Sequence, residues 1–245
     1  MVCSRLAKRF DLKDFAFAHR GLWSGGGPTE NSLEAFQSAA EQGLGIEFDV
    51  RPSSDGTPII FHDPTLDRMT ETSGLVEKIA SDQLIGTPLK GGGEIVALER
   101  LLEVWPEDLP LLCELKIDGV TDPETFAARV APMIESYSGL AAMMSFSPIA
   151  VSAVPASIMR GQLLAPRKGD PSTDLAQGHG FEVDYLACHV DDTANPFLQK
   201  ARSRMPLITW TVTSDPQCCD LSGITDSQIF EGFDPALAKR HILNR

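Results

Sequence analysis

Nine short runs of strand-forming residues recur along the whole chain, with helix-like or polar stretches between them. The runs cover residues 15–19, 45–50, 58–62, 109–116, 141–146, 157–164, 185–190, 207–212 and 227–233. This alternation is typical of repeated β/α units around a parallel sheet. A chain of 245 residues also has the length of one α/β barrel. We therefore predict a TIM (β/α)8 barrel, in which either the run at 157–164 or the run at 185–190 is irregular.

Three of the intervening stretches have a helical period. Asn31 is predicted to cap the first of them, with Glu34 placed as in a capping box and Gly43 at the C-terminal stop. Residues 97–105 and 123–137 repeat the helical pattern, and a proline at position 132 is expected to kink the latter.

The segment from Asp63 to about Glu94 is too long and too polar for a simple β/α connection. It ends in three consecutive glycines, at positions 91–93. No helix start with a Lys-Ser or Lys-Thr pair follows them, which favours a mobile loop over a phosphate cradle. We expect a small insertion at about 63–94, after the third strand, within a single domain that spans residues 1–245.

The charge balance limits the partners that the chain can have. The formal net charge is −13. Proteins that bind nucleic acids or anionic membranes need clustered Lys and Arg, so this charge argues against both as main partners. No run approaches the roughly 18 apolar residues of a membrane span, and no signal-peptide pattern precedes the first strand. We expect a cytoplasmic protein with no nucleic-acid partner and no stable membrane insertion. An anionic small molecule would need a local positive site.

The five cysteines, at positions 3, 113, 188, 218 and 219, have no CxxC spacing. Neither a disulfide framework nor a zinc site is indicated. A cysteine nucleophile is also disfavoured, because Cys113 points to the strand face opposite Glu114 and no histidine is placed by sequence to activate it.

Charged side chains stand at the ends of the second and fourth runs with a spacing of two residues. Glu47 and Asp49 therefore point to one side of their strand, and Glu114 and Lys116 to one side of theirs. In such barrels the C-terminal strand ends form the active site. Carboxylates alone suit a hard cation, Mg²⁺ or Ca²⁺. A network of ion pairs with Arg20, Arg51 or Lys116 is an equally open interpretation of the residues alone.

Two histidines, His19 and His62, end the first and third runs. Imidazole titrates near neutral pH, so one can act as a base while the other acts as an acid.

Arg20 and Lys116 supply positive charge for a phosphate, and a guanidinium matches two phosphate oxygens. The same two cations could instead neutralise the carboxylates, and the two roles can coexist. His189 also ends a run, and we expect a structural role for it. The role of His179 stays open.

The motifs resemble those of the glycerophosphodiester phosphodiesterases. They lie in AHRGLWSGGGPTENSLEAFQSAAEQGLGIEFDV at 18–50, DGTPIIFHDPTLDRMTETSG at 55–74 and LCELK at 112–116. The order HRG, EN, E-x-D, HD and E-x-K is highly specific when taken together.

The resemblance implies a TIM barrel with one divalent cation, which hydrolyses glycerophosphodiesters to an alcohol and sn-glycerol 3-phosphate. The residues that match the family's site are His19 and His62 as general acid and base, Glu47, Asp49 and Glu114 as metal ligands, Arg20 and Lys116 as phosphate-contacting cations, Glu30 beside the metal shell, and Trp210 as an apolar pocket wall. Trp210 as a barrel-core aromatic is the competing interpretation. Asn31 is assigned to capping.

The second half of the chain departs from the family pattern. The family commonly ends with a strand like GIITD before a proline, and this chain has Glu231-Gly232 in place of the Thr-Asp pair.

Three alternatives to the main hypothesis remain: a related phosphodiesterase for lysophospholipids, one for another phosphodiester, or a barrel that binds without catalysis. The alcohol, the cation, the route of attack on phosphorus and the oligomeric state are not encoded in these motifs.

Overall fold

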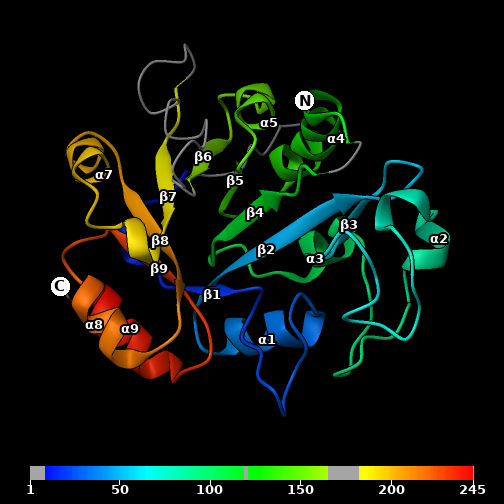
Figure 1. The fold of residues 1–245 in the computed structure, drawn as a ribbon, viewed down its shortest axis with the longest axis horizontal. Helices are drawn as coiled ribbons and strands as arrows, with labels where there is room; N and C mark the ends of the chain where they lie inside the picture. The colour runs from blue at the N-terminus through cyan, green and yellow to red at the C-terminus, as the bar shows by residue number, and fades with distance from the viewer. Residues whose placement is uncertain (1–8, 119–120, 165–181, 245) are drawn as a thin grey trace.

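Eight parallel strands close into a barrel in the computed structural model, which describes residues 9–118, 121–164 and 182–244 (Figure 1). Strand β1 pairs with both β9 and β2, and this double pairing closes the ring. The barrel strands are β1 (Phe17–His19), β2 (Gly45–Pro52), β4 (Leu111–Leu115), β5 (Ala141–Ser145), β6 (Met159–Leu164), β7 (Tyr185–His189), β8 (Leu207–Val212) and β9 (Ser227–Phe230). The predicted TIM barrel is confirmed.

The irregular strand is not the one that we expected. Both β6 and β7 are regular barrel strands, so the prediction that one of the runs at 157–164 and 185–190 is irregular was wrong. The extra strand is β3 (Pro58–Ile60), which pairs antiparallel with β2 outside the ring. Only residues 53–57 separate β2 from β3. A connection this short permits a hairpin but no parallel crossover.

Helices surround the barrel and cover its outer face (Figure 1). Their bounds are α1 (Leu33–Glu41), α2 (Ser81–Leu84), α3 (Leu98–Val104), α4 (Pro123–Ser136), α5 (Pro148–Ala153), α7 (Pro196–Arg202), α8 (Asp215–Leu221) and α9 (Pro235–Leu243), with single 3₁₀ turns η1 (Leu12–Asp14), η2 (Val76–Lys78) and η3 (Val190–Asp192). Helix α4 continues through Pro132. Within the described residues, no helix is long and apolar enough to cross a membrane.

The first helix begins one residue later than its predicted cap. Ser32 is the N-cap of α1, and its hydroxyl accepts a hydrogen bond from the amide of Ala35. The predicted capping role of Asn31 was therefore wrong. Asn31 has a φ of 57°, a left-handed conformation that asparagine tolerates, and this turns its side chain away from the helix. Gly43 has a φ of 63° just after α1 and ends the helix as predicted.

The insertion between β3 and α3 is better packed than its polar sequence suggests. Leucine, isoleucine and valine side chains of this segment form an apolar cluster of their own over β3. The hydroxyl of Thr29 donates to the carbonyl of Gly92 at 2.7 Å, which ties the glycine loop to the β1–α1 connection. The insertion therefore rests against the segment that follows β1.

The barrel interior is filled by side chains from alternate strand positions. Tyr185 is fully buried there and lies over Gly161 of the neighbouring strand β6. A Cβ atom on Gly161 would lie 2.2 Å from the tyrosine ring, so only glycine admits the ring at this place. Other apolar side chains, with Phe48 and Cys113 among them, point outward into the layer between strands and helices.

One buried cation joins three parts of the chain beside the C-terminal strand ends. Arg51, only 1% exposed, lies near the end of β2. Its Nε donates to the carbonyl oxygen of His62 at 2.6 Å, and both terminal nitrogens bind the carboxylate of Asp118, beyond β4. Arg51 thus fixes the backbone at His62 relative to β2 and β4.

We predict that Arg51→Met lowers the free energy of unfolding by about 2–4 kcal/mol. The change removes a fully buried guanidinium and leaves the partly buried carbonyl of His62 and the half-exposed carboxylate of Asp118 without their donor, and such losses cost about this much. Urea denaturation would measure it. The exposed pair of Arg100 with Glu103 offers a control, since Arg100→Met should cost less than about 0.5 kcal/mol. Equal stabilities of the two variants would contradict this role of Arg51.

Candidate active site

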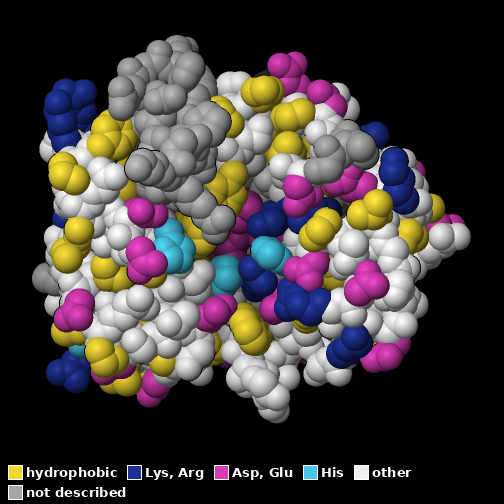
Figure 2. Space-filling model, in the orientation of Figure 1, with side chains coloured by type: hydrophobic (Ala, Val, Ile, Leu, Met, Phe, Trp, Pro, Cys, Tyr) yellow, Lys and Arg dark blue, Asp and Glu magenta, His cyan; other side chains and the backbone are white. Residues whose placement is uncertain are grey.

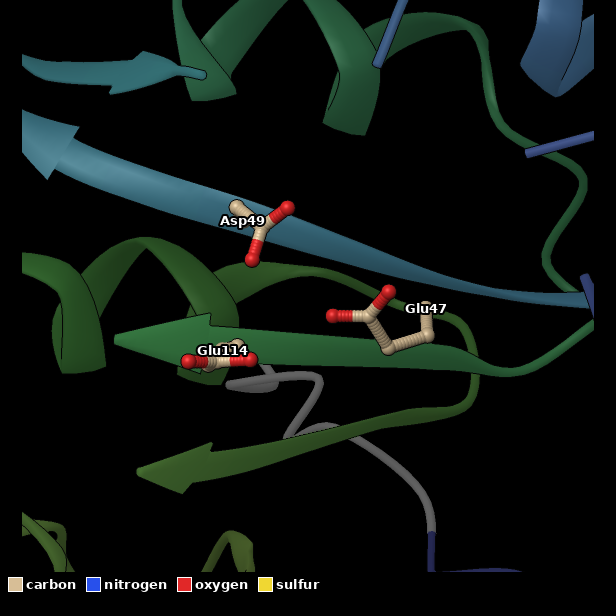
Figure 3. Close-up of side chains that lie close together, drawn as sticks. All are labelled: Glu47, Asp49 and Glu114. Atoms are coloured by element: carbon tan, nitrogen blue, oxygen red, sulfur yellow. The ribbon is translucent and has the colours of Figure 1, made fainter. Parts of the chain in front are cut away.

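Three carboxylates meet inside the C-terminal end of the barrel. Glu47 and Asp49 stand on β2 and Glu114 on β4, and the three side chains turn toward a shared space (Figure 3). In the strand register, Asp49 lies opposite Glu114 and Glu47 lies beside His19. One oxygen of each carboxylate lies within 4.8 Å of the others, and the residues are 2%, 1% and 7% exposed. The sequence prediction that these side chains converge is confirmed.

Two cations compensate these charges unevenly. The ammonium group of Lys116 lies 2.8 Å from Glu114 and 3.3 Å from Asp49, and the Nε of Arg20 lies 3.3 Å from Asp49. Burial would raise the pKa of Asp49, but Lys116 and Arg20 outweigh it and hold the pKa well below its usual range. Burial, with repulsion from Asp49 and Glu114, raises the pKa of Glu47 well above its usual range. Glu47 is therefore the least compensated of the three.

The donor set fits a hard divalent cation. Glu47 receives a hydrogen bond from the backbone amide of Arg20 at 3.2 Å, and the Nε2 of His19 lies 3.8 Å from its carboxylate. A buried carboxylate without a strong cationic partner is costly. An ion held by Glu47, Asp49 and Glu114 would remove this cost, since Mg²⁺ and Ca²⁺ take carboxylate oxygens as ligands.

His19 ends β1 with both ring nitrogens beside carboxylates. Nδ1 lies 2.6 Å from Glu231, which directly follows β9, and Nε2 lies on the side of Glu47. The backbone here is also fixed, because the indole nitrogen of Trp23 donates to the carbonyl of His19 at 3.0 Å. The imidazole side chain is 15% exposed, so it borders the pocket.

His62 lies two residues beyond β3 and has a carboxylate of its own. Its Nδ1 lies 2.7 Å from Asp63, whose pKa is lowered to about 2: burial alone would raise it, but hydrogen bonds from Arg68 and His62 prevail. The pKa of His62 is lowered, first by burial and then by the positive charges of Lys116 and Arg20, against the attraction of Asp49. His62 is thus held toward its neutral form, which can accept a proton.

A chain of ion pairs joins the insertion to the carboxylate cluster. Arg68 binds Asp63 and Glu30, and Glu30 in turn binds Arg20 at 2.8 Å. Glu30 is 7% exposed, and the guanidinium groups of Arg68 and Arg20 outweigh the effect of burial and lower its pKa. Glu30 thus reaches the carboxylate cluster through Arg20, and its place beside a metal shell stays a prediction.

Asn31 belongs to the site and not to the helix cap. Its side-chain nitrogen donates to Asp49 at 2.9 Å, and its side-chain oxygen accepts from the amide of Asp49 at 3.3 Å. The two contacts orient the Asp49 carboxylate. Asn31 has a left-handed backbone, and no periodic pattern in the sequence reveals such a conformation.

The pocket above the carboxylates has a polar and an apolar side. Figure 2 shows histidine, cationic and acidic side chains around a central hollow. Its volume is about 230 Å³. The apolar side comprises Met144, Phe146, Leu163, Trp210 and Ile229. Trp210 lines the pocket and also packs against the apolar cluster of the barrel interior, so both interpretations of it hold in part. Its ring packs edge-on against Phe146 at 5.5 Å and His189 at 5.2 Å.

The remaining reactive side chains lie elsewhere. Cys113 is fully buried on the outer face of β4, away from the pocket. His189 packs against Trp210, and its Nδ1 accepts from the amide of Asp191 at 3.3 Å. Cys3 and His179 lie outside the described residues.

Sequence reasoning missed three charged residues that contact the histidine rings or the partners of those rings: Asp63, Arg68 and Glu231. Asp63 and Arg68 stand in the quoted HDPTLDR stretch, so the motif contained them without assigning them a contact. Glu231 stood out only as a departure from the family's usual ending.

Comparison with known sequences places these residues in one family. The model of the glycerophosphoryl diester phosphodiesterase family matches residues 19–159, more than half of the chain. A Mycobacterium tuberculosis relative is 37% identical over 109 residues, 44% of this chain and 40% of its own length. Rat glycerophosphodiester phosphodiesterase 1 is 43% identical over 70 residues, 28% of this chain and 20% of its own. The chain thus matches less than half the length of these relatives.

A solved structure covers nearly the whole chain. A phosphodiesterase of Oleispira antarctica, in complex with the product sn-glycerol-3-phosphate, superposes with a TM-score of 0.76 at 25% identity, over 93% of this chain and 96% of its own. The likeness thus extends past residue 159, where the family model ends, through the second half of the barrel. The chain belongs to the glycerophosphoryl diester phosphodiesterase family.

Proposed function

We propose that this chain is a glycerophosphodiester phosphodiesterase, a single catalytic domain that hydrolyses glycerophosphodiesters to an alcohol and sn-glycerol 3-phosphate. The observation that carries the proposal is the buried triad of Glu47, Asp49 and Glu114, placed between two histidines in one pocket. The product bound to the Oleispira antarctica relative supports the choice of substrate.

In this proposal, Glu47, Asp49 and Glu114 hold one divalent cation, Mg²⁺ or Ca²⁺. The bound ion would supply Lewis-acid charge for the phosphate oxygens and acidify a coordinated hydroxyl. Arg20 and Lys116 line the same pocket, and each is already paired with a carboxylate. They add positive charge on the phosphate side, which a chain of net charge −13 needs in order to bind an anion.

His19 and His62 carry the two proton transfers. One takes a proton from the attacking hydroxyl, and the other gives a proton to the departing alcohol. Each has a carboxylate at Nδ1, which leaves Nε2 for the exchange with substrate. The nucleophile is either the substrate's 2-hydroxyl, through a cyclic phosphate that water opens, or water itself.

The pocket suits a compact substrate. Its 230 Å³ lies below the roughly 300–1,000 Å³ of pockets for drug-sized ligands. The apolar side formed by Phe146, Leu163 and Trp210 accepts a short carbon skeleton beside the phosphate. A lysophospholipid, the alternative substrate, also has an apolar part, but its acyl chain would have to extend out of this pocket. A barrel that only binds is disfavoured, because both histidines and all three carboxylates are in place.

The test is release of sn-glycerol 3-phosphate from a panel of glycerophosphodiesters, and of lysophosphatidic acid from one lysophospholipid, with Mg²⁺, Ca²⁺ or EDTA. We expect turnover of the glycerophosphodiesters, lost in EDTA and restored by the cation. Turnover of the lysophospholipid alone would replace the proposed substrate. No turnover of any substrate with either cation would favour the binding barrel.

We predict that His19→Ala and His62→Ala each lower kcat by roughly 10²-fold to 10⁴-fold, the usual contribution of a proton-transfer group. Steady-state kinetics on a turned-over glycerophosphodiester would measure this. His241→Ala is the matched control, since His241 binds Asp215 outside the pocket and its loss should leave kcat near wild type. Near wild-type turnover by His62→Ala would disprove the assigned role.

We also predict that a divalent cation stabilises the wild-type protein and not Glu47→Gln. A ligand at about 100 times its dissociation constant adds about 2.7 kcal/mol to the free energy of unfolding. Without the cation, Glu47→Gln should be no less stable than wild type, because it removes one of three neighbouring negative charges. Denaturation with EDTA and with Mg²⁺ or Ca²⁺ would measure both effects, with Glu103→Gln as an exposed control. A variant that keeps the full gain would contradict the assignment of Glu47.

A further inference from the structure

The closure of the barrel brings Glu231 beside His19. Strands β1 and β9 pair in register, with Phe17 opposite Ile229 and Ala18 opposite Phe230. The next residues along the two strands are His19 and Glu231, so the pairing places them side by side although 212 residues separate them. The amide of Glu231 donates to the carbonyl of Val212 on β8 at 2.9 Å, which anchors its backbone.

We infer that Glu231 is the positioning residue of His19. It fixes the imidazole with Nδ1–H donated to the carboxylate and Nε2 left for the substrate. The expected loss of activity rests on the proposed function, whereas the expected orientation of the His19 ring does not. It also gives a role to the place where the chain departs from the family's usual ending.

The contact is suited to this role. A carboxylate only accepts hydrogen bonds, so the nitrogen that it meets at 2.6 Å is the one that carries the hydrogen. The Glu231 side chain is 24% exposed and the His19 side chain 15%, so the contact lies at the edge of the pocket, partly shielded from water. Nε2 lies 3.8 Å from Glu47, beyond hydrogen-bond distance, so within the described residues only the Nδ1 contact selects the tautomer.

The two histidines are held by carboxylates of different kinds. Asp63, the partner of His62, is bound by Arg68, which offsets much of its charge. No arginine or lysine of the described chain lies within ion-pair distance of Glu231. The Glu231 carboxylate therefore acts on His19 alone, and its removal should affect the protein through that ring.

The decisive experiment combines kinetics with imidazole ¹⁵N NMR on Glu231→Gln, Glu231→Ala, His19→Ala and the double variant His19→Ala/Glu231→Ala. We expect both single Glu231 variants to lower kcat by about 10-fold to 100-fold with little change in KM, the usual cost of losing the partner that orients a site histidine. Gln fills the same space but can donate to Nδ1 and so favour the other tautomer. A purely space-filling side chain would leave Glu231→Gln at wild-type kcat and would overturn the inference.

The double variant separates action through His19 from action on substrate. If Glu231 works through His19, the double variant has the kcat of His19→Ala alone. Effects that multiply in the double variant would show an independent role and would contradict the inference. Glu103→Gln, which removes an exposed carboxylate on α3, is the control for a general effect of charge.

The NMR arm does not depend on turnover. At a pH where the imidazole is neutral, the wild-type His19 signals should report the Nδ1–H tautomer, and both Glu231 variants should shift toward Nε2–H. His19→Ala identifies the signals. An unchanged tautomer would overturn the inference even in an active enzyme. The expected shift in a protein without turnover would support it while the proposed function fails.

Discussion

The repulsion among three buried carboxylates is the constraint on which the rest of the site depends. Glu47, Asp49 and Glu114 lie within a few ångströms of one another at the bottom of a pocket that water hardly reaches. Such a cluster persists only when cations compensate it. The protein supplies two, Arg20 and Lys116, and these leave Glu47 the least satisfied. The three carboxylates therefore offer oxygen ligands for one more positive charge, the divalent cation of the proposed function.

The charged side chains and the apolar side chains of the pocket come from different strands of the barrel. The charged and histidine side chains come from β1, β2, the β3 hairpin and β4, whereas β5, β6 and β8 mainly present apolar side chains to the pocket. The ring closes between β9 and β1, and there Glu231 reaches back to the charged side. Three contacts hold the polar half in place. Arg51 donates to the backbone carbonyl of His62, and Asn31 donates to the carboxylate of Asp49. Arg68, from the insertion, binds both Asp63 and Glu30.

The sequence predicted those features that depend on period and spacing. All nine strand runs became strands, and the two-residue spacings in Glu47-x-Asp49 and Glu114-x-Lys116 correctly placed side chains on one face. The place of β3 was missed, because pattern alone does not tell a hairpin strand from a barrel strand; the short connection after β2 contained that information. Asn31 was assigned to the cap because a left-handed backbone leaves no periodic signal. The contact of Glu231 with His19 arises only when the barrel closes.

A crystal structure grown with Mn²⁺ and measured at its absorption edge would test the central claim most directly. Mn²⁺ shares the preference of Mg²⁺ and Ca²⁺ for carboxylate oxygens. The account predicts one strong anomalous peak at about 2.0–2.6 Å from an oxygen of each of Glu47, Asp49 and Glu114. A map with no peak between these carboxylates, and with Lys116 still bound to Glu114 and Asp49, would mean that the cluster is an ion-pair network, and the metal-dependent mechanism would have to be abandoned.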